Sequence, residues 1–235
     1  MIATYAAGEK GARRAMREGA TVVVVDAYRA STTVAVLVQK GARVVPVASI
    51  EEAASYPGAD YRIGERGSAK VRGFDFGNSP TEIQEADIVP GSTVVLSSTN
   101  GTRIIEAARG APSILAGAFV NAHAVADALL ADGNPDSRVT VVGCGWQGRQ
   151  ASEDESAAGT ILARLRDRDA HLEERAERIV KAHLKRPERS LRSNSAARRL
   201  KRLDYGRDLD YCLALNKVPV VPRLLDGAFV SGERA

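Results

Sequence analysis

Five carboxylate residues are candidates for a shared site that binds a hard metal ion: Asp26, Glu65, Asp75, Glu153 and Asp154. No Cys or His stands beside them, and carboxylate oxygens are the ligands that Mg²⁺ prefers in proteins. Bound magnesium would neutralise the oxygens of a phosphate monoester while a carboxylate orients the attacking water. The set therefore predicts metal-assisted hydrolysis, although Glu153 or Asp154 taken alone is more typical of the acidic first turn of a helix, where it compensates the helix dipole.

Three arginines add fixed positive charge to this set: Arg29, Arg66 and Arg103. The planar guanidinium group binds phosphate, sulfonate or carboxylate groups through paired hydrogen bonds. The turn formed by Asn100, Gly101 and Thr102 precedes a predicted helix, and the first backbone N–H groups of a helix also suit an anion. The sequence thus predicts a small anionic substrate that carries a phosphate group.

No residue is recognisable as an activated nucleophile. A Ser or Cys nucleophile ordinarily needs a nearby base such as His, and neither Cys144 nor Cys212 has a recognisable partner in the sequence. We therefore expect water to attack the substrate directly, without a covalent enzyme intermediate. Both cysteines are expected to be unpaired, because a chain of this length needs no disulfide to fold.

The elements that must position these residues follow an α/β pattern. Short β-branched runs alternate with helical segments, at residues 21–25, 43–47, 93–96, 113–115, 138–142 and 218–221. The run at 22–25 is apolar at successive positions, which indicates a strand covered on both faces. The pattern predicts a three-layer α/β/α fold with a largely parallel or mixed sheet. Asp26 closes its strand and should lie at the carboxyl edge, where open α/β sheets bind ligands.

Several boundaries can be predicted from local signals. Ser31 and Thr102 are candidate helix caps, and Ser152 with Glu155 has the spacing of a capping box that opens a helix over 153–165. Residues 61–80 combine glycines and charges without periodicity, which predicts an irregular segment that forms part of a site. Residues 186–195 are polar and contain a proline, so we expect a flexible connection there.

Composition and charge describe a globular protein with one core. The chain has 235 residues, of which 44% are hydrophobic and 26% charged, and we expect residues 1–235 to form a single domain. No apolar run approaches the roughly 20 residues needed to cross a bilayer, and the first 20 residues contain no signal-peptide pattern. These features predict a cytoplasmic protein that binds no membrane. A homodimer is the default expectation for such an enzyme.

Two alternative functions remain open on the sequence alone. The glycines from Gly143 to Gly148 follow a strand with the GxGxxG spacing of nicotinamide-dependent oxidoreductases. The expected helix, however, begins only near Ser152, which weakens the match. Residues 164–207 contain 15 Lys/Arg and 7 Asp/Glu, a charge that could bind nucleic acid. Because the segment has no Phe or Trp for base stacking, we favour a solvated helical face, with Glu174/Arg178 and Glu177/Lys181 as i,i+4 pairs.

Six short motifs in order resemble the 2-phosphosulfolactate phosphatase family. They are DAYRASTT at 26–33, GERG at 64–67, GFDFGNSP at 73–80, TNGT at 99–102, GAFVN at 117–121, and ED at 153–154 followed by AG at 158–159. The resemblance covers residues 22–159, with a weaker echo at 209–225. It implies an α/β/α, Mg²⁺-dependent phosphatase that hydrolyses 2-phosphosulfolactate to sulfolactate and phosphate, a step in coenzyme M biosynthesis.

The resemblance also implies roles for individual positions. It assigns Asp26, Glu65, Asp75, Glu153 and Asp154 to the metal ion and the water. The predicted residues for the substrate anions are Arg29, Ser31, Thr32, Arg66, Asn100, Gly101, Thr102 and Arg103. We take Asp26, Arg29, Glu65 and Asp154 as the catalytic candidates, without assigning the general base. The chain departs from the family pattern at Ala27 and Tyr28, where Val-Leu is common, and at Ser31, where Thr is common.

Overall fold

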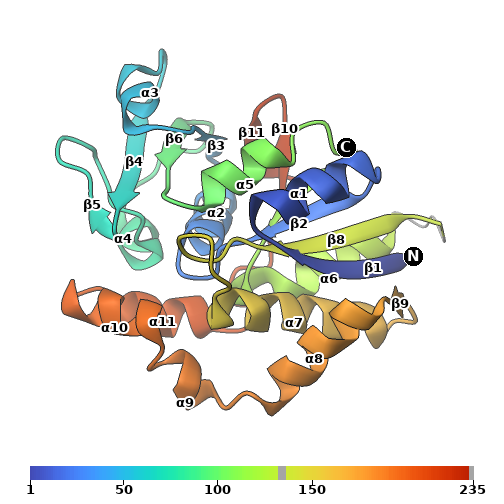
Figure 1. Cartoon of the computed structure of the whole chain (residues 1–235). Coiled ribbons are helices and arrows are strands. Elements are labelled where there is room, and N and C mark those ends of the chain that lie inside the picture. Colours follow the sequence, from blue (N-terminus) through green and yellow to red (C-terminus); the bar gives the residue numbers. More distant parts are fainter. Residues whose placement is uncertain (132–135, 233–235) are drawn as a thin grey trace.

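The chain folds into three layers, with helices on both faces of a mixed sheet (Figure 1). The structure is a computed structural model that describes residues 1–131 and 136–232. It confirms the predicted α/β class. No helix in these two ranges combines the length and the apolar character that a membrane span requires.

The sheet contains two blocks of parallel strands that an antiparallel hairpin joins, with the short strand β5 added antiparallel to β4 at one edge. Within the described residues its order is β5-β4-β6-β3-β11-β10-β7-β2-β8-β1-β9. The hairpin β10–β11 pairs with β7 on one side and with β3 on the other, antiparallel in both cases. The strands are β1 (Ile2–Ala7), β2 (Thr21–Val25), β3 (Arg43–Pro46), β4 (Tyr61–Arg66), β5 (Ala69–Lys70), β6 (Thr93–Ser97), β7 (Ile114–Gly117), β8 (Arg138–Gly143), β9 (His171–Leu172), β10 (Pro222–Leu225) and β11 (Ala228–Ser231).

The helices cover both faces because the central strands are apolar at successive positions. Along β2, Val22 and Val24 join one core cluster, whereas Val23 and Val25 join the other. Helices α1 and α5 lie on the first face, and α6, α7 and α8 on the second (Figure 1). The helices are α1 (Gly8–Arg17), α2 (Ala30–Gln39), α3 (Ile50–Ser55), α4 (Pro80–Glu85), α5 (Gly101–Ala107), α6 (Ala122–Ala131), α7 (Ser152–Arg166), α8 (Glu174–Lys185), α9 (Glu188–Leu191), α10 (Ser195–Arg202) and α11 (Gly206–Leu213), with a short 3₁₀ turn η1 (Phe119–Asn121).

The three predicted helix caps are wrong by one or two positions. Helix α2 begins at Ala30, and the Ser31 hydroxyl lies inside the first turn, where it donates to the carbonyl of Val24. Thr102 likewise lies inside α5 and donates to the carbonyl of Ser98. Helix α7 begins at Ser152 itself, without a side-chain cap. In each case the hydroxyl or carboxyl group bonds to another part of the fold instead of the free N–H groups of its own helix.

Two segments are more regular than their composition predicts. Residues 61–80 contain strand β4, which pairs in parallel with β6, and the short strand β5. Residues 186–195 contain helix α9, and Arg186 ties this segment to the Ser152 carbonyl and the Ser156 hydroxyl of α7. The predicted strand at 218–221 lies just before the actual strand β10. Strand pairing orders residues 61–80, and the hydrogen bonds of Arg186 help to order residues 186–195. The local sequence patterns indicated neither.

Candidate functional site

Four of the five predicted carboxylates line one pocket, which we call the carboxylate pocket. Asp26 follows β2, Glu65 lies near the end of β4, and Glu153 and Asp154 lie in the first turn of α7. The pocket itself is narrow, about 20 Å³ in volume. It shares Trp146, Glu153 and Arg199 with an adjoining outer cavity of about 650 Å³.

Asp154 joins two of the loops that form the pocket. Its two oxygens accept backbone hydrogen bonds from Ala27 and Gly145, both at 2.8 Å. Burial raises the pKa of Asp154 well above its usual value, and the charges of Asp26 and Glu153 raise it further. Asp154 therefore holds the turn after β2 against the loop after β8, at an electrostatic cost.

Glu65 makes a second link of the same kind. Its carboxylate accepts from the N–H of Ser68 at 2.7 Å and from the N–H of Thr99 at 2.6 Å. It thereby joins the β4–β5 hairpin to the loop after β6. Glu153 accepts from the amide of Asn194 at 2.7 Å, and burial raises its pKa. Glu65, Glu153 and Asp154 are all buried.

Asp26 is the carboxylate with the weakest protein contacts. Its Oδ1 accepts only a long bond of 3.3 Å from the N–H of Ala30, and Oδ2 has no donor in the described part of the chain. Desolvation raises the pKa of Asp26 to about 7, and the neighbouring charge of Glu65 adds to this. Gly101 allows the helix α5 to approach, because a Cβ at that position would lie 3.2 Å from Oδ2. At neutral pH Asp26 is therefore poised to change its protonation or to accept a cation.

Arg29 lies at the back of the pocket, but its charge is already neutralised. The side chain is buried, with Nη1 donating to Asp208 at 2.6 Å and Nη2 donating to the carbonyl of Ser68 at 2.7 Å. The guanidinium group also stacks on Tyr205, 4.2 Å from the ring centroid. Arg29 therefore ties the turn after β2 to helix α11 and to the β4–β5 hairpin.

The other predicted substrate residues divide into two groups. Asn100 lines the pocket, Gly101 lies beside Asp26, and the hydroxyls of Ser31, Thr32 and Thr102 are buried in bonds to backbone carbonyls. Of these five residues only Asn100 lines the carboxylate pocket, whereas Ser31, Gly101 and Thr102 line a separate, mainly apolar cavity.

The structure does not bring the remaining candidates to the carboxylate pocket. Arg103 is exposed, and Arg66 is exposed with its guanidinium bound to the Glu65 carbonyl and the Ser97 hydroxyl. Asp75 is also exposed, and its carboxylate accepts from the N–H of Arg62 at 2.7 Å.

Sequence reasoning missed several residues of the pocket. Asn78 belongs to the same motif as Asp75, yet it is Asn78 that lines the pocket, with its amide oxygen buried and without a partner. An amide oxygen beside carboxylates is a recognisable hard ligand, so the motif contained this signal. Trp146 and Arg199 had no such signal, because one lies in a glycine-rich loop and the other among many exposed arginines.

The carboxylate pocket offers oxygen ligands to a metal ion but, among the described residues, no preformed cage. Over residues 1–131 and 136–232, no three His, Cys, Asp or Glu side chains form a ready-made metal cage. Magnesium, however, usually takes one or two carboxylates and completes its shell with waters and substrate phosphate. The unpartnered oxygens of Asp26 and Asn78, together with the raised pKa of Asp26, fit an ion of that kind.

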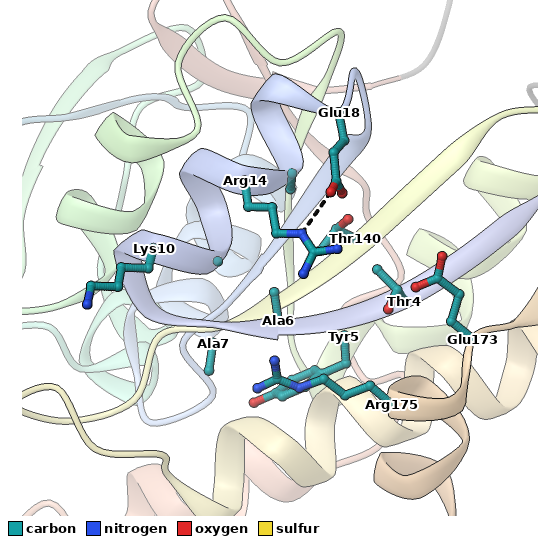
Figure 2. Close-up of a pocket in the computed structure, with 12 residues that line it drawn as sticks. Thr4, Tyr5, Ala6, Ala7, Lys10, Arg14, Glu18, Thr140, Glu173 and Arg175 are labelled. Carbon is teal, nitrogen blue, oxygen red and sulfur yellow. Dashed lines mark hydrogen bonds and ion pairs between the residues drawn. The ribbon is translucent and has the colours of Figure 1, made fainter.

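A second cavity has a different character. It has a volume of about 330 Å³ and lies along strand β1 between α1 and the start of α8 (Figure 2). Its carboxylates are Glu18, which pairs with Arg14 at 2.7 Å, and Glu173, which pairs with Arg138 at 2.8 Å. We call it the β1 cavity. Its acidic groups are paired and exposed, so nothing in it resembles the carboxylate pocket.

The two alternative functions find limited structural support. No helix begins inside residues 143–148, as the dinucleotide motif requires; the segment forms a turn with mutual backbone bonds between Trp146 and Arg149. In the basic segment, the Glu174–Arg178 pair is confirmed. The same segment supplies Arg199 to the pocket, which a purely solvated face would not do.

Comparison with known proteins gives one consistent result. The family model for 2-phosphosulpholactate phosphatase matches residues 8–227. A probable 2-phosphosulfolactate phosphatase of Carboxydothermus hydrogenoformans is 39% identical over 213 residues, covering 87% of this chain and 86% of that protein. One from Thermotoga petrophila is 36% identical over 216 residues, with 91% and 92% covered, and one from Synechococcus sp. (strain CC9605) is 37% identical over 215 residues, with 85% and 87% covered.

Proposed function

Because this chain belongs to the 2-phosphosulfolactate phosphatase family and is therefore a phosphoric monoester hydrolase, we propose that it hydrolyses 2-phosphosulfolactate to sulfolactate and phosphate with Mg²⁺ as cofactor. The observation that carries the proposal is the carboxylate pocket, where four acidic groups converge and the buried Arg29 is already bound to Asp208. A magnesium ion would supply positive charge to this pocket, and it would also bind the phosphoryl oxygens of the substrate.

Asp26 and Asn78 are the residues that we propose to hold the ion. Both line the pocket, and both have an oxygen that receives no hydrogen bond from residues 1–131 and 136–232. When bound, the ion would stabilise negative charge on the phosphoryl oxygens. Glu65 and Asp154 keep this arrangement in place, since each clamps two backbone N–H groups from different loops.

We propose Glu153 as the general base. It lines both the pocket and the outer cavity, which is where water would enter, and burial raises its pKa toward the range that suits proton transfer. The water oxygen forms the new bond to phosphorus, its proton passes to Glu153, and the bond between phosphorus and the lactate oxygen breaks. That oxygen then takes a proton from solvent to give sulfolactate.

The test is phosphate release from 2-phosphosulfolactate with magnesium and with chelator. We expect turnover to disappear on chelation and to return with added magnesium. Asp26→Asn should lower turnover by about 10²–10⁴-fold, which is the scale of losing a group that acts at the reacting centre. It should also abolish the rise in melting temperature that magnesium gives to the wild-type protein. Full turnover in chelator, or normal turnover in the Asp26→Asn variant, would disprove the magnesium assignment.

Cytoplasmic location, a role in coenzyme M biosynthesis and a homodimer remain parts of this proposal. The family resemblance supports the pathway role, and the lack of a membrane-spanning helix among the described residues is compatible with the location. Size-exclusion chromatography with light scattering tests the dimer directly.

A further inference from the structure

Arg199 and Trp146 form the boundary between the carboxylate pocket and the outer cavity. Both residues line both spaces. The Arg199 guanidinium lies 3.8 Å from the centroid of the Trp146 ring, and its Nε donates to the Ser68 hydroxyl at 2.9 Å. Arg199 comes from α10 and Trp146 from the loop after β8, so two distant segments of the chain meet at this point.

Arg199 differs from Arg29 in the state of its charge. Arg29 is bound to Asp208, whereas Arg199 forms no ion pair in the described part of the chain, and its terminal nitrogens donate no hydrogen bond there. The stack on Trp146 fixes the plane of the guanidinium without using its outer N–H groups. Arg199 is thus oriented and half-buried, with donors available to an anion.

The outer cavity has the charge that an anionic group requires. Arg149 and Arg199 line it together with several neutral polar side chains, and Glu153 is its single carboxylate among the described residues. The carboxylate pocket has the opposite balance, with four acidic groups. A phosphate bound with a cation fits the pocket, but a second anion of the same molecule would be repelled there and attracted outside it.

Resting on the proposed function, we infer that Arg199 is a specificity-determining residue that binds the sulfonate group of the substrate at the mouth of the pocket. In 2-phosphosulfolactate the phosphorylated carbon bears the carboxylate directly, whereas it bears the sulfonate through an intervening CH2 group. The sulfonate is therefore the anionic group that reaches farthest from the phosphate, and the boundary residues lie where it would emerge. The Arg199 fork would donate two hydrogen bonds to the sulfonate oxygens.

The kinetic test compares 2-phosphosulfolactate with 2-phospholactate, which keeps the carboxylate and lacks the sulfonate. Arg199→Gln should raise KM for 2-phosphosulfolactate by about 10- to 100-fold, the range for losing hydrogen bonds to a charged group. The kcat/KM for 2-phospholactate should change by less than threefold. Arg199→Lys should recover part of the loss, since it keeps the charge without the planar fork.

Arg198→Gln is the matched control. Arg198 is the adjacent residue on α10, it is exposed, and it bonds to the Ser193 carbonyl instead of facing the pocket. The Arg198→Gln substitution removes one positive charge from the same helix, so the kinetics of this variant should equal those of the wild type. Equal losses on both substrates in Arg199→Gln, or no loss on either, would overturn the inference.

A fluorescence titration tests the inference without turnover. Trp146 is the only tryptophan of the chain. Intrinsic tryptophan emission therefore reports on the ring against which Arg199 stacks. Sulfolactate should change the emission of the wild type and of Arg198→Gln with saturation, whereas Arg199→Gln should show at least a tenfold weaker midpoint, and lactate should have no effect.

This second readout separates the two hypotheses. If the wild type releases no phosphate from 2-phosphosulfolactate but its fluorescence response to sulfolactate depends on Arg199, the proposed function is wrong and the sulfonate site stands. If sulfolactate leaves the wild-type emission unchanged, or changes the wild type and Arg199→Gln equally, the sulfonate site is wrong whatever the turnover.

Discussion

The carboxylate pocket and the β1 cavity contain similar residue types in opposite electrostatic conditions. In the β1 cavity, Glu18 pairs with Arg14 at 2.7 Å (Figure 2). Glu173 pairs with Arg138 at 2.8 Å, and all four side chains are partly exposed. In the carboxylate pocket Glu65, Glu153 and Asp154 are buried, and the buried Arg29 is already bound to Asp208. The β1 cavity is the larger of the two, and the charges of its acidic groups are already neutralised by arginines.

Charge compensation, rather than cavity size, is the ground on which we propose the carboxylate pocket as the active site. Buried carboxylates repel one another and lose hydration, so a fold that keeps several together holds them at a cost in stability. Raised pKa values of Asp26, Glu153 and Asp154 record this cost. A ligand that removes it gains binding energy, which paired surface charges cannot provide.

The sharpest test of this contrast is the buried ion pair behind the pocket. Asp208→Ala should lower the free energy of unfolding by about 3–5 kcal/mol, because it leaves the buried charge of Arg29 unpaired. It also removes the acceptor for the hydroxyls of Ser79 and Thr81. Urea unfolding monitored by circular dichroism measures the change.

Asp127→Ala is the control for that experiment. Asp127 pairs with Arg164 through two bonds of 3.0 Å, but both side chains are partly exposed. Its loss should cost at most about 1 kcal/mol. Similar losses in the two variants would mean that burial does not separate the two kinds of pair, and the comparison between the cavities would lose its basis.

Much of the sheet could be predicted because its central strands can be recognised from short stretches of sequence. The run Val22 to Val25 is apolar at every position, and it forms a strand covered on both faces. Strand β4 could not be recognised in the same way, since Tyr61, Arg62, Glu65 and Arg66 are polar or amphipathic and the strand owes its order to pairing with β6. The structure of that region depends on contacts between segments that are distant in the sequence, and a short stretch of sequence does not reveal such contacts.

The same division applies to the site. Asp26 could be predicted because it closes a recognisable strand, and Glu65 because it lies in a segment rich in glycine and charge and in the GERG motif. Arg199 could not be distinguished from the other basic residues of 164–207, since its role depends on where α10 packs. Asp75 and Asn78 illustrate the limit, because three positions in one motif separate an exposed carboxylate from a buried, unpartnered amide.

Asp26 gives the next test, through the pH dependence of stability without metal. Its pKa is about 7 in the folded protein against an ordinary value of 3.8, so the folded state retains a proton that the unfolded state loses. The stability contributed by this proton is complete below pH 4 and is lost as the pH rises through about 7. In chelator, the wild type should therefore lose on the order of 3 kcal/mol more than Asp26→Asn over that interval.

Unfolding by urea at several pH values between 4 and 8 measures this difference. Asp26→Asn keeps an oxygen for the Ala30 N–H and removes the titrating group, so the two proteins should diverge steadily as the pH rises. Parallel curves for the two proteins would show that Asp26 is not the uncompensated charge. A greater loss in Asp26→Asn would reverse the sign and contradict the account of the pocket.

The smallest expected effect belongs to the β1 cavity. Glu18→Gln removes the carboxylate that pairs with Arg14 across one turn of α1, where both side chains are largely exposed. Such pairs contribute about 0.3–0.5 kcal/mol, and kcat/KM for 2-phosphosulfolactate should stay within twofold of the wild type. Phosphate release and urea unfolding on the same sample measure both quantities. A tenfold loss of turnover with unchanged stability would mean that the β1 cavity takes part in the reaction, because a paired surface charge has no other route to the chemistry.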